Sequence, residues 1–191
     1  MVIRSGIKII NLATYYLLFS FLILVSFANA QNSALAVKGT QSNFGNLKTV
    51  SQFGHVVFAD QPDKETISLL KDQNISLVIN IRAENESEGY DERKAVEEAG
   101  VAFIQIPYMK GRYINGEALD EILSLVEATA ANGSKIMLHC THSQRAGSVL
   151  GAALYRDYGY SKEEANEYAK QAGLTSEFLT KIHNEFLDTL K

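Results

Sequence analysis

The sequence predicts a single α/β domain, in which a mainly parallel central sheet of about four to five strands is flanked by helices. Two observations lead to this prediction. Short apolar runs rich in β-branched residues, at 77–81, 101–106 and 136–139, have the length and composition of buried strands. These runs alternate with segments of helical character, and strands that alternate with helices join in parallel with helices on both faces of the sheet.

The remaining elements of the first half follow from local signals. Residues 50–59 predict two short strands joined at Gly54. Asp63 is a cap for a short helix, and a second helix runs through 91–99 and ends at a glycine. Residues 111–116 are expected to form a loop.

The second half is mostly helical. Residues 117–131 carry apolar side chains at helical spacing, which predicts an amphipathic helix. A Ser-x-x-Glu capping box opens a later helix at Ser161. We expect Thr175 to cap the last helix, with Phe178 among the apolar side chains of its buried face.

The first thirty residues have the features of a signal peptide. Arg4 and Lys8 give a positive start, residues 12–27 are mostly apolar, and Ala28-Asn29-Ala30 fits a small-x-small cleavage site. We therefore expect cleavage after Ala30 and a periplasmic or secreted protein. The alternative is a membrane anchor formed by the uncleaved segment, although the apolar run is slightly short for a span of about 20 residues.

Composition divides the rest of the chain into two parts. A flexible leader, 31–49, is rich in Asn, Ser, Gly and Gln, and the folded domain covers 50–191. Loss of Arg4 and Lys8 with the signal peptide reduces the 18 basic residues to 16, against 22 acidic ones, for a net charge near −6. An acidic protein is a poor partner for nucleic acid or an anionic membrane surface, so we expect neither.

The stretch from Lys135 to Gly147 combines a strand, a polar loop and the start of a helix. Its apolar run ends in His139-Cys140, and the helix begins near Arg145. Loop amides and a helix dipole of roughly half a positive charge favour a bound anion and a cysteine thiolate. The planar guanidinium of Arg145 can hold two oxygens of a phosphate. Cys140 is the only cysteine, so no internal disulfide competes for its thiol.

His139-Cys140 followed by Arg145 resembles the signature loop of the cysteine-dependent phosphatases, the protein-tyrosine and dual-specificity superfamily. Four residues separate Cys140 from Arg145, one fewer than in the common form, and this spacing resembles the branch called beta-lactamase-hydrolase-like phosphatases. Three upstream segments are also similar to that branch: Phe58-Ala59-Asp60-Gln61-Pro62, Leu77-Val78-Ile79-Asn80-Ile81-Arg82 and Ile104-Gln105-Ile106-Pro107.

The resemblance covers about residues 55–160. It implies a dual-specificity-phosphatase-like fold and the hydrolysis of phosphate monoesters, with no metal and no cofactor. Cys140 would attack phosphorus and form a phosphocysteine, while Arg145 and loop amides hold the non-bridging oxygens. The implied substrate-binding residues are Thr141, His142, Ser143 and Gln144. We expect His139 to be structural, with its ring hydrogen-bonded to the loop backbone.

Three features depart from the family pattern. Ser143 replaces a glycine at a position that often needs positive φ, which costs serine about 1 kcal/mol or more. Ala146 replaces a Ser or Thr that assists release of the cysteine from phosphate in many relatives. Residues 108–115 contain no carboxylate, where many relatives carry an aspartic general acid. The alternative proton donors are His142, Glu117, Asp120 and the group Glu84, Glu86 and Glu88.

Other functions are compatible with parts of this pattern. A rhodanese-type sulfurtransferase also holds a cysteine in a ring of amides, and a catalytically weak, phosphate-binding pseudophosphatase would explain Ala146 and the missing acid. His139, Cys140 and His142 together are also candidate ligands for Zn or Cu(I). We expect a phosphatase that acts on a phosphorylated protein or a small phosphate ester, without stable membrane association after cleavage of the signal peptide.

Overall fold

The computed structural model describes residues 44–86 and 89–190. The expected signal peptide, 1–30, and residues 31–43 of the expected leader lie outside this part of the chain. No helix of the described part is both long enough and apolar enough to cross a membrane.

The last residues of the expected leader, from Phe44 on, contact the folded domain. Phe44 is buried with 4% of its surface exposed. The Asn46 side-chain amide donates to Asp63 Oδ2 at 2.8 Å and to Glu65 Oε2 at 2.9 Å. Polar composition suggested a leader here, but one aromatic side chain and one amide fix the segment to the helix that follows.

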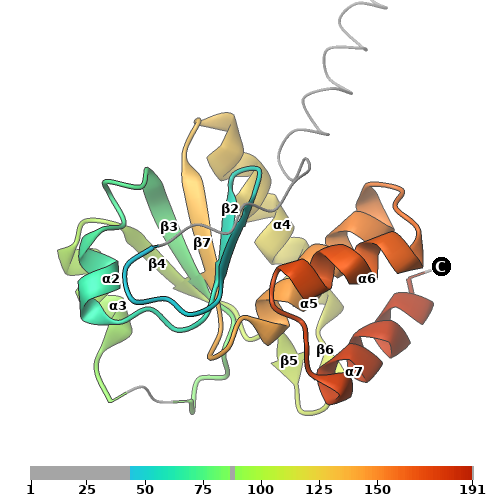
Figure 1. Ribbon diagram of the computed structural model, residues 1–191. Coiled ribbons are helices and arrows are strands. Elements are labelled where there is room, and N and C mark those ends of the chain that lie inside the picture. The colour runs from blue at the N-terminus through green and yellow to red at the C-terminus, as the bar shows by residue number, and fades with distance from the viewer. Residues whose placement is uncertain (1–43, 87–88, 191) are drawn as a thin grey trace, which may run out of the picture. The chain divides into compact units, whose positions relative to one another are not determined.

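A five-stranded sheet in the order β1-β2-β7-β3-β4 forms the middle of the domain (Figure 1). β1 and β2 pair antiparallel around Gly54, which has a φ of 56°, and the other three pairings are parallel. The predicted α/β fold is therefore confirmed. The strands are β1 (Val50–Phe53), β2 (Val56–Ala59), β3 (Ile75–Asn80), β4 (Ala102–Gln105) and β7 (Lys135–His139).

Helices cover both faces of this sheet, and β7 divides its side chains between them. Ile136 and Leu138 pack in a core with α4 (Gly116–Ala131), α5 (Gln144–Asp157) and α6 (Lys162–Gln171). Met137 packs on the other face with α2 (Lys64–Ser68) and α3 (Glu92–Glu98). This alternation is the period of two expected of a strand, so that β7, in the middle of the sheet, is covered on both sides.

The start of α7 (Glu177–Asp188) differs from the prediction by one residue. Ser176, not Thr175, is its cap, because the Ser176 hydroxyl accepts from the Leu179 amide at 3.4 Å. Phe178 was expected on the buried face, but 54% of its surface is exposed. The capping box at Ser161 is present as predicted.

Residues 109–114 form a small hairpin instead of the expected loop. β5 (Met109–Lys110) pairs antiparallel with β6 (Tyr113–Ile114), and Gly111 at the turn has a φ of 62°. Strands of two residues are too short to show an alternating pattern in the sequence, which explains why the hairpin was missed.

A buried polar chain attaches α7 to α5. His183 is fully buried, and its Nδ1 lies 2.9 Å from Ser148 Oγ, which in turn lies 3.4 Å from the Tyr108 hydroxyl. Burial, assisted by the charge of Lys162, lowers the pKa of His183 to about 4. The ring is therefore neutral at ordinary pH, as a histidine between packed helices must be unless it is paired with an acid.

Candidate active site

The loop predicted from the sequence lies where three parallel strands end. β7 ends at His139, and α5 begins at Gln144. On one side, the Gln61 amide after β2 donates to the Thr141 carbonyl at 3.4 Å. On the other, the Ile81 amide after β3 donates to the His139 carbonyl at 3.0 Å. Segments that follow β2 and β3 therefore border the loop, as is common at the carboxyl edge of a parallel sheet.

Ser143 turns the loop into the helix. Its φ of 60° and ψ of −1° are left-handed, as the family's glycine at this position leads one to expect. The Ser143 hydroxyl donates to the Ala172 carbonyl at 2.7 Å in a fully buried position. That hydrogen bond, worth about 1 kcal/mol, offsets a backbone cost of similar size.

Gln144 fastens the loop to the start of α7. Its Oε1 accepts from the amides of Thr175 and Ser176 at 2.8 and 2.9 Å, and its Nε2 donates to Thr175 Oγ1 at 2.9 Å. The side chains of Ser143 and Gln144 are thus used in the fold. Any contact of these two residues with an anion would come from their backbone amides, since the first amides of a helix have no partner within it.

The structure brings Cys140 and Arg145 together. Cys140 is buried, and the Arg145 side chain is 16% exposed. Burial alone would lower the pKa of Arg145, but its contacts with Glu86 and with the Cys140 side chain raise that pKa above its ordinary value. The nucleophile and the cation predicted for the site are therefore direct neighbours.

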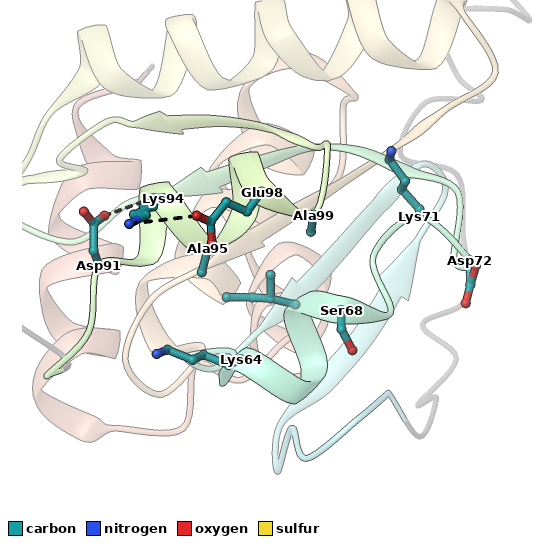
Figure 2. Close-up of a pocket in the computed structure, with 10 residues that line it drawn as sticks. Lys64, Ser68, Lys71, Asp72, Asp91, Lys94, Ala95, Glu98 and Ala99 are labelled. Carbon is teal, nitrogen blue, oxygen red and sulfur yellow. Dashed lines mark hydrogen bonds and ion pairs between the residues drawn. The ribbon is translucent and has the colours of Figure 1, made fainter.

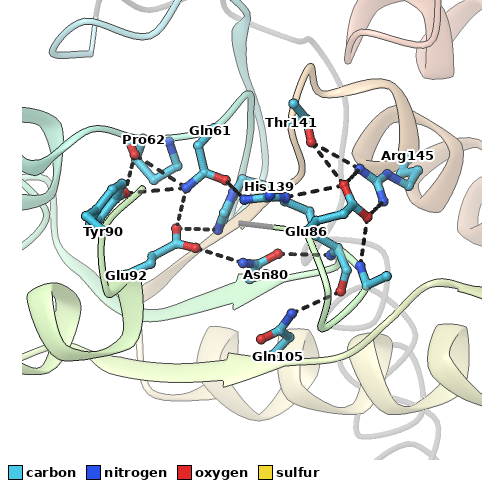
Figure 3. A network of polar contacts seen from close by, with 12 residues as sticks. Gln61, Pro62, Asn80, Glu86, Tyr90, Glu92, Gln105, His139, Thr141 and Arg145 are labelled. Carbon is cyan, nitrogen blue, oxygen red and sulfur yellow. Dashed lines mark hydrogen bonds and ion pairs between the residues drawn. The ribbon is translucent and has the colours of Figure 1, made fainter. Parts of the chain in front are cut away.

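Glu86 holds the Arg145 guanidinium with both of its oxygens (Figure 3). Oε1 accepts from Nη1 at 2.6 Å and Oε2 from Nη2 at 2.8 Å. Oε2 also accepts from the Thr141 hydroxyl at 3.2 Å, and Oε1 from the Ala83 amide at 2.8 Å. The bond to Arg145 lowers the pKa of Glu86 to about 2. Glu86 is therefore ionised at neutral pH and is a partner of the cation, not a proton donor.

A second polar network lies beneath the loop, with the Glu92 carboxylate at its centre (Figure 3). Oε1 lies 2.9 Å from Gln61 Nε2 and 3.0 Å from His139 Nε2, and Oε2 accepts from Asn80 Nδ2 at 2.7 Å. Burial would raise the pKa of Glu92, but these contacts, led by His139, bring it below its ordinary value. His139 is thus structural, but its partner is a carboxylate and not the loop backbone that we expected.

The other predicted proton donors differ in their partners and in their exposure to solvent. Glu117 is exposed and lies 3.2 Å from Lys110 Nζ, and Asp120 lies 2.7 Å from Arg156 Nη1. Glu84 is exposed, and Glu88 lies outside the described residues. Of the candidates that the structure describes, His142 belongs to the loop and Glu86 contacts it through Thr141 and Arg145.

His142 is exposed, and its backbone bridges to Asp60. His139, by contrast, is fully buried. Within residues 44–86 and 89–190, no group of three or more His, Cys, Asp or Glu side chains is arranged to hold a metal ion. The structure therefore brings together the parts of an anion site rather than the three ligands considered for Zn or Cu(I).

A groove with a volume of about 720 Å³ lies away from the loop, between α2 and α3 (Figure 2). None of residues 140–145 lines it. Asp91 at its edge caps α3, and Lys94 lies 3.9 Å from Glu98. Asp91, Lys94 and Glu98 are thus engaged in the stability of a short helix, and the groove is separate from the loop. The lining residues are Lys64, Ile67, Ser68, Lys71, Asp72, Asp91, Lys94, Ala95, Glu98 and Ala99.

Several solved structures share this fold. Tk-PTP in its active form shares 21% identity over 74% of this chain and 97% of its own, with a TM-score of 0.61. TpbA of P. aeruginosa shares 16% over 80% and 90%, with a TM-score of 0.63. PTPMT1 in complex with PI(5)P shares 21% over 71% and 91%, with a TM-score of 0.57. No curated protein sequence matches the chain.

These likenesses define the class of the fold, that of the protein-tyrosine and dual-specificity phosphatases. The family follows from the sequence itself. Residues 55–158, more than half of the chain, match the model of the family described as "Polymorphic toxin system, DSP-PTPase phosphatase". The chain belongs to this family and is a cysteine-dependent phosphoric monoester hydrolase of the protein-tyrosine-phosphatase type.

Sequence reasoning missed how two acids serve the site. Glu86 was considered only as a proton donor, although it holds Arg145, and Glu92 was not singled out at all. A signal for the second network was present, because Gln61 and Asn80 lie in the segments that resemble the phosphatase family. Nothing local identified their common partner, which lies on the next helix.

We expect Glu86→Gln to lower kcat/KM for an aryl phosphate by about tenfold or more, because hydrogen bonds between charged groups contribute about 1.5–3 kcal/mol. The side-chain amide of the introduced glutamine has only one acceptor oxygen, so it holds the Arg145 guanidinium less firmly beside Cys140. Steady-state kinetics measure the effect. Glu97→Gln is the matched control, since Glu97 is an exposed acid 3.5 Å from Arg93. Faster turnover or tighter phosphate binding by Glu86→Gln would mean that Glu86 blocks the site instead of shaping it.

Proposed function

We propose that this protein is an exported phosphatase that hydrolyses phosphate monoesters through a phosphocysteine intermediate. The observation that carries the proposal is the contact of Arg145 with Cys140, in a loop that leads into the N-terminus of α5. The thiolate is the nucleophilic form of a cysteine, and the neighbouring Arg145 would hold oxygens of the phosphate during the attack.

In the first step, Cys140 Sγ attacks phosphorus as the bond from phosphorus to the ester oxygen breaks. Arg145 and the amides of 141–145 hold the three non-bridging oxygens, where charge develops. The leaving oxygen takes a proton from an acid. In the second step, water attacks the phosphocysteine, and inorganic phosphate and the free thiolate are released.

Ala146 makes the second step the slower one in this proposal. Ala146 follows Arg145 and is fully buried. Because its side chain is a methyl group, it offers no hydroxyl at the position where many relatives have one to assist release of the cysteine. A weakly active enzyme in which phosphocysteine accumulates is the consequence.

A phosphorylated protein or a small aryl phosphate is the proposed substrate. Two structural neighbours support a phosphate ester, since a cysteine-to-serine variant of TpbA is solved in complex with pTyr and PTPMT1 in complex with PI(5)P. At identities of 16% and 21%, these neighbours support the fold and the class of chemistry without naming the substrate.

The export part of the proposal rests on Arg4, Lys8, the apolar run and Ala28-Asn29-Ala30. N-terminal sequencing of the protein from an expressing cell is expected to begin at Gln31. Recovery in the membrane fraction with Met1 retained would replace secretion by anchoring.

We expect Cys140→Ser to abolish turnover of an aryl phosphate while it leaves binding of inorganic phosphate nearly unchanged, since the clamp is intact. Arg145→Lys is expected to weaken phosphate binding and to lower kcat by about 10²-fold, because a point charge cannot replace a two-pronged contact. Arg156→Lys is the control, since Arg156 is paired with Asp120 and Asp157 away from the loop. Turnover by Cys140→Ser at the parental rate would exclude the cysteine mechanism.

His142 is the proposed proton donor, because it is exposed on the loop while Glu86 is held ionised. We expect His142→Ala to slow the hydrolysis of phenyl phosphate, whose phenolate is a poor leaving group, by about 10²-fold. Hydrolysis of an activated nitrophenyl ester should change little. His55→Ala is the matched control, since His55 lies before β2 and contacts the Ser134 carbonyl at 2.9 Å. Equal losses with both esters would show that His142 supports the loop and that another group supplies the proton.

A further inference from the structure

Among the described residues, Tyr113 and Phe178 are the exposed large hydrophobic side chains, with 77% and 54% of their surfaces accessible. They come from β6 and α7, which are far apart in the sequence but lie side by side (Figure 1). Arg112, next to Tyr113, joins them, since its Cζ lies 5.6 Å from the centre of the Phe178 ring. We call Arg112, Tyr113 and Phe178 the aromatic rim.

The α7 side of the rim is fixed to the loop that holds Cys140. Gln144 binds the amides of Thr175 and Ser176 at 2.8 and 2.9 Å, and Ser176 caps α7. Phe178 is two residues further on, in the first turn of the helix. Its position therefore depends directly on a residue of the loop.

The hairpin side of the rim is fixed to the same edge of the sheet. The Tyr108 amide, just before β5, donates to the Ile81 carbonyl at 3.2 Å. The Ile81 amide in turn donates to the carbonyl of His139, one residue before Cys140, at 3.0 Å. The hairpin with Arg112 and Tyr113 thus starts at the end of the sheet where the loop lies.

Core packing does not explain the rim. Ile182 and Leu187 already supply the buried apolar side chains of α7, and Phe178 is left outside. Its ring is partnered by Arg112 in a cation–π contact at an exposed site. Exposed tyrosine, phenylalanine and arginine side chains together are the composition that protein interfaces favour at their centres.

We propose that the aromatic rim binds the polypeptide that flanks the phosphorylated residue of a protein substrate. This inference rests on the proposed function, because it assigns a substrate class to the same site. The rings of Tyr113 and Phe178 would receive an apolar or aromatic side chain, and Arg112 would receive an acidic one. The protein carries a net charge of −4, so a local cation such as Arg112 favours the approach of an acidic phosphopeptide.

The test measures binding, separately from turnover, in a Cys140→Ser background. The probe is a fluorescent phosphotyrosine peptide with an aspartate and a leucine beside the phosphorylated residue, followed by anisotropy. Inorganic phosphate, which cannot span both sites, is measured by competition. We expect Tyr113→Ala with Phe178→Ala, and separately Arg112→Ala, to weaken peptide binding about tenfold and to leave the phosphate constant within about twofold. Lys181→Ala, an exposed cation of the same helix, is the control.

Three outcomes would refute the proposal that the aromatic rim binds the peptide. They are undetectable binding of the peptide, peptide binding that is unchanged in the rim variants, and losses that are equal for peptide and for inorganic phosphate. Stronger rim-dependent binding to vesicles containing a phosphoinositide than to the peptide would reject a polypeptide ligand. Turnover of an aryl phosphate by the parent protein is measured in parallel. If the parent protein shows no turnover but binds the peptide through the rim, only the proposed catalysis is refuted. If turnover is normal but peptide binding does not depend on the rim, only the proposed role of the rim is refuted.

Discussion

The site depends on an arginine that must stay charged and oriented beside a buried cysteine. Arg145 is largely buried, and an unpaired guanidinium there would be costly. Glu86 meets this requirement with two short contacts, of 2.6 and 2.8 Å, and remains ionised because its pKa is about 2. A guanidinium has five donors, so a carboxylate on Nη1 and Nη2 does not exhaust its capacity to bind phosphate. Glu86 thereby orients the clamp for an anion.

The carboxylate must itself be held, and the segment after β3 does this. The Ala83 amide binds Glu86 Oε1, and Arg82 binds Gln61 Oε1 at 2.6 Å. Gln61 then reaches Glu92, whose other contacts come from Asn80 and His139. Segments after β2, β3 and β7 are thus joined through polar side chains under the loop. Contacts that join three strand ends in this way favour a preorganised anion site.

The sequence predicted those parts of the fold that are encoded locally. The strand before Cys140, the left-handed position of Ser143 and the capping box at Ser161 each depend on a few adjacent residues, and each is present. The partner of His139, by contrast, lies 47 positions earlier, and the partner of Arg145 lies 59 positions earlier. Charge alone does not specify such pairs. The prediction for Phe178 was wrong for a related reason. Helical periodicity indicated that its side chain is buried, but burial depends on tertiary packing, which leaves this side chain exposed.

Formation of phosphocysteine at Cys140 is tested by rapid acid quench after the protein is mixed with a labelled aryl phosphate. Because Ala146 leaves the second step unassisted, the intermediate is expected to accumulate within the first turnover. We expect labelled phosphorus on the peptide that contains Cys140, and none in the Cys140→Ser variant. A persulfide on that peptide after incubation with thiosulfate, with no phosphopeptide from any aryl phosphate that is turned over, would contradict it and assign sulfur-transfer chemistry to the loop.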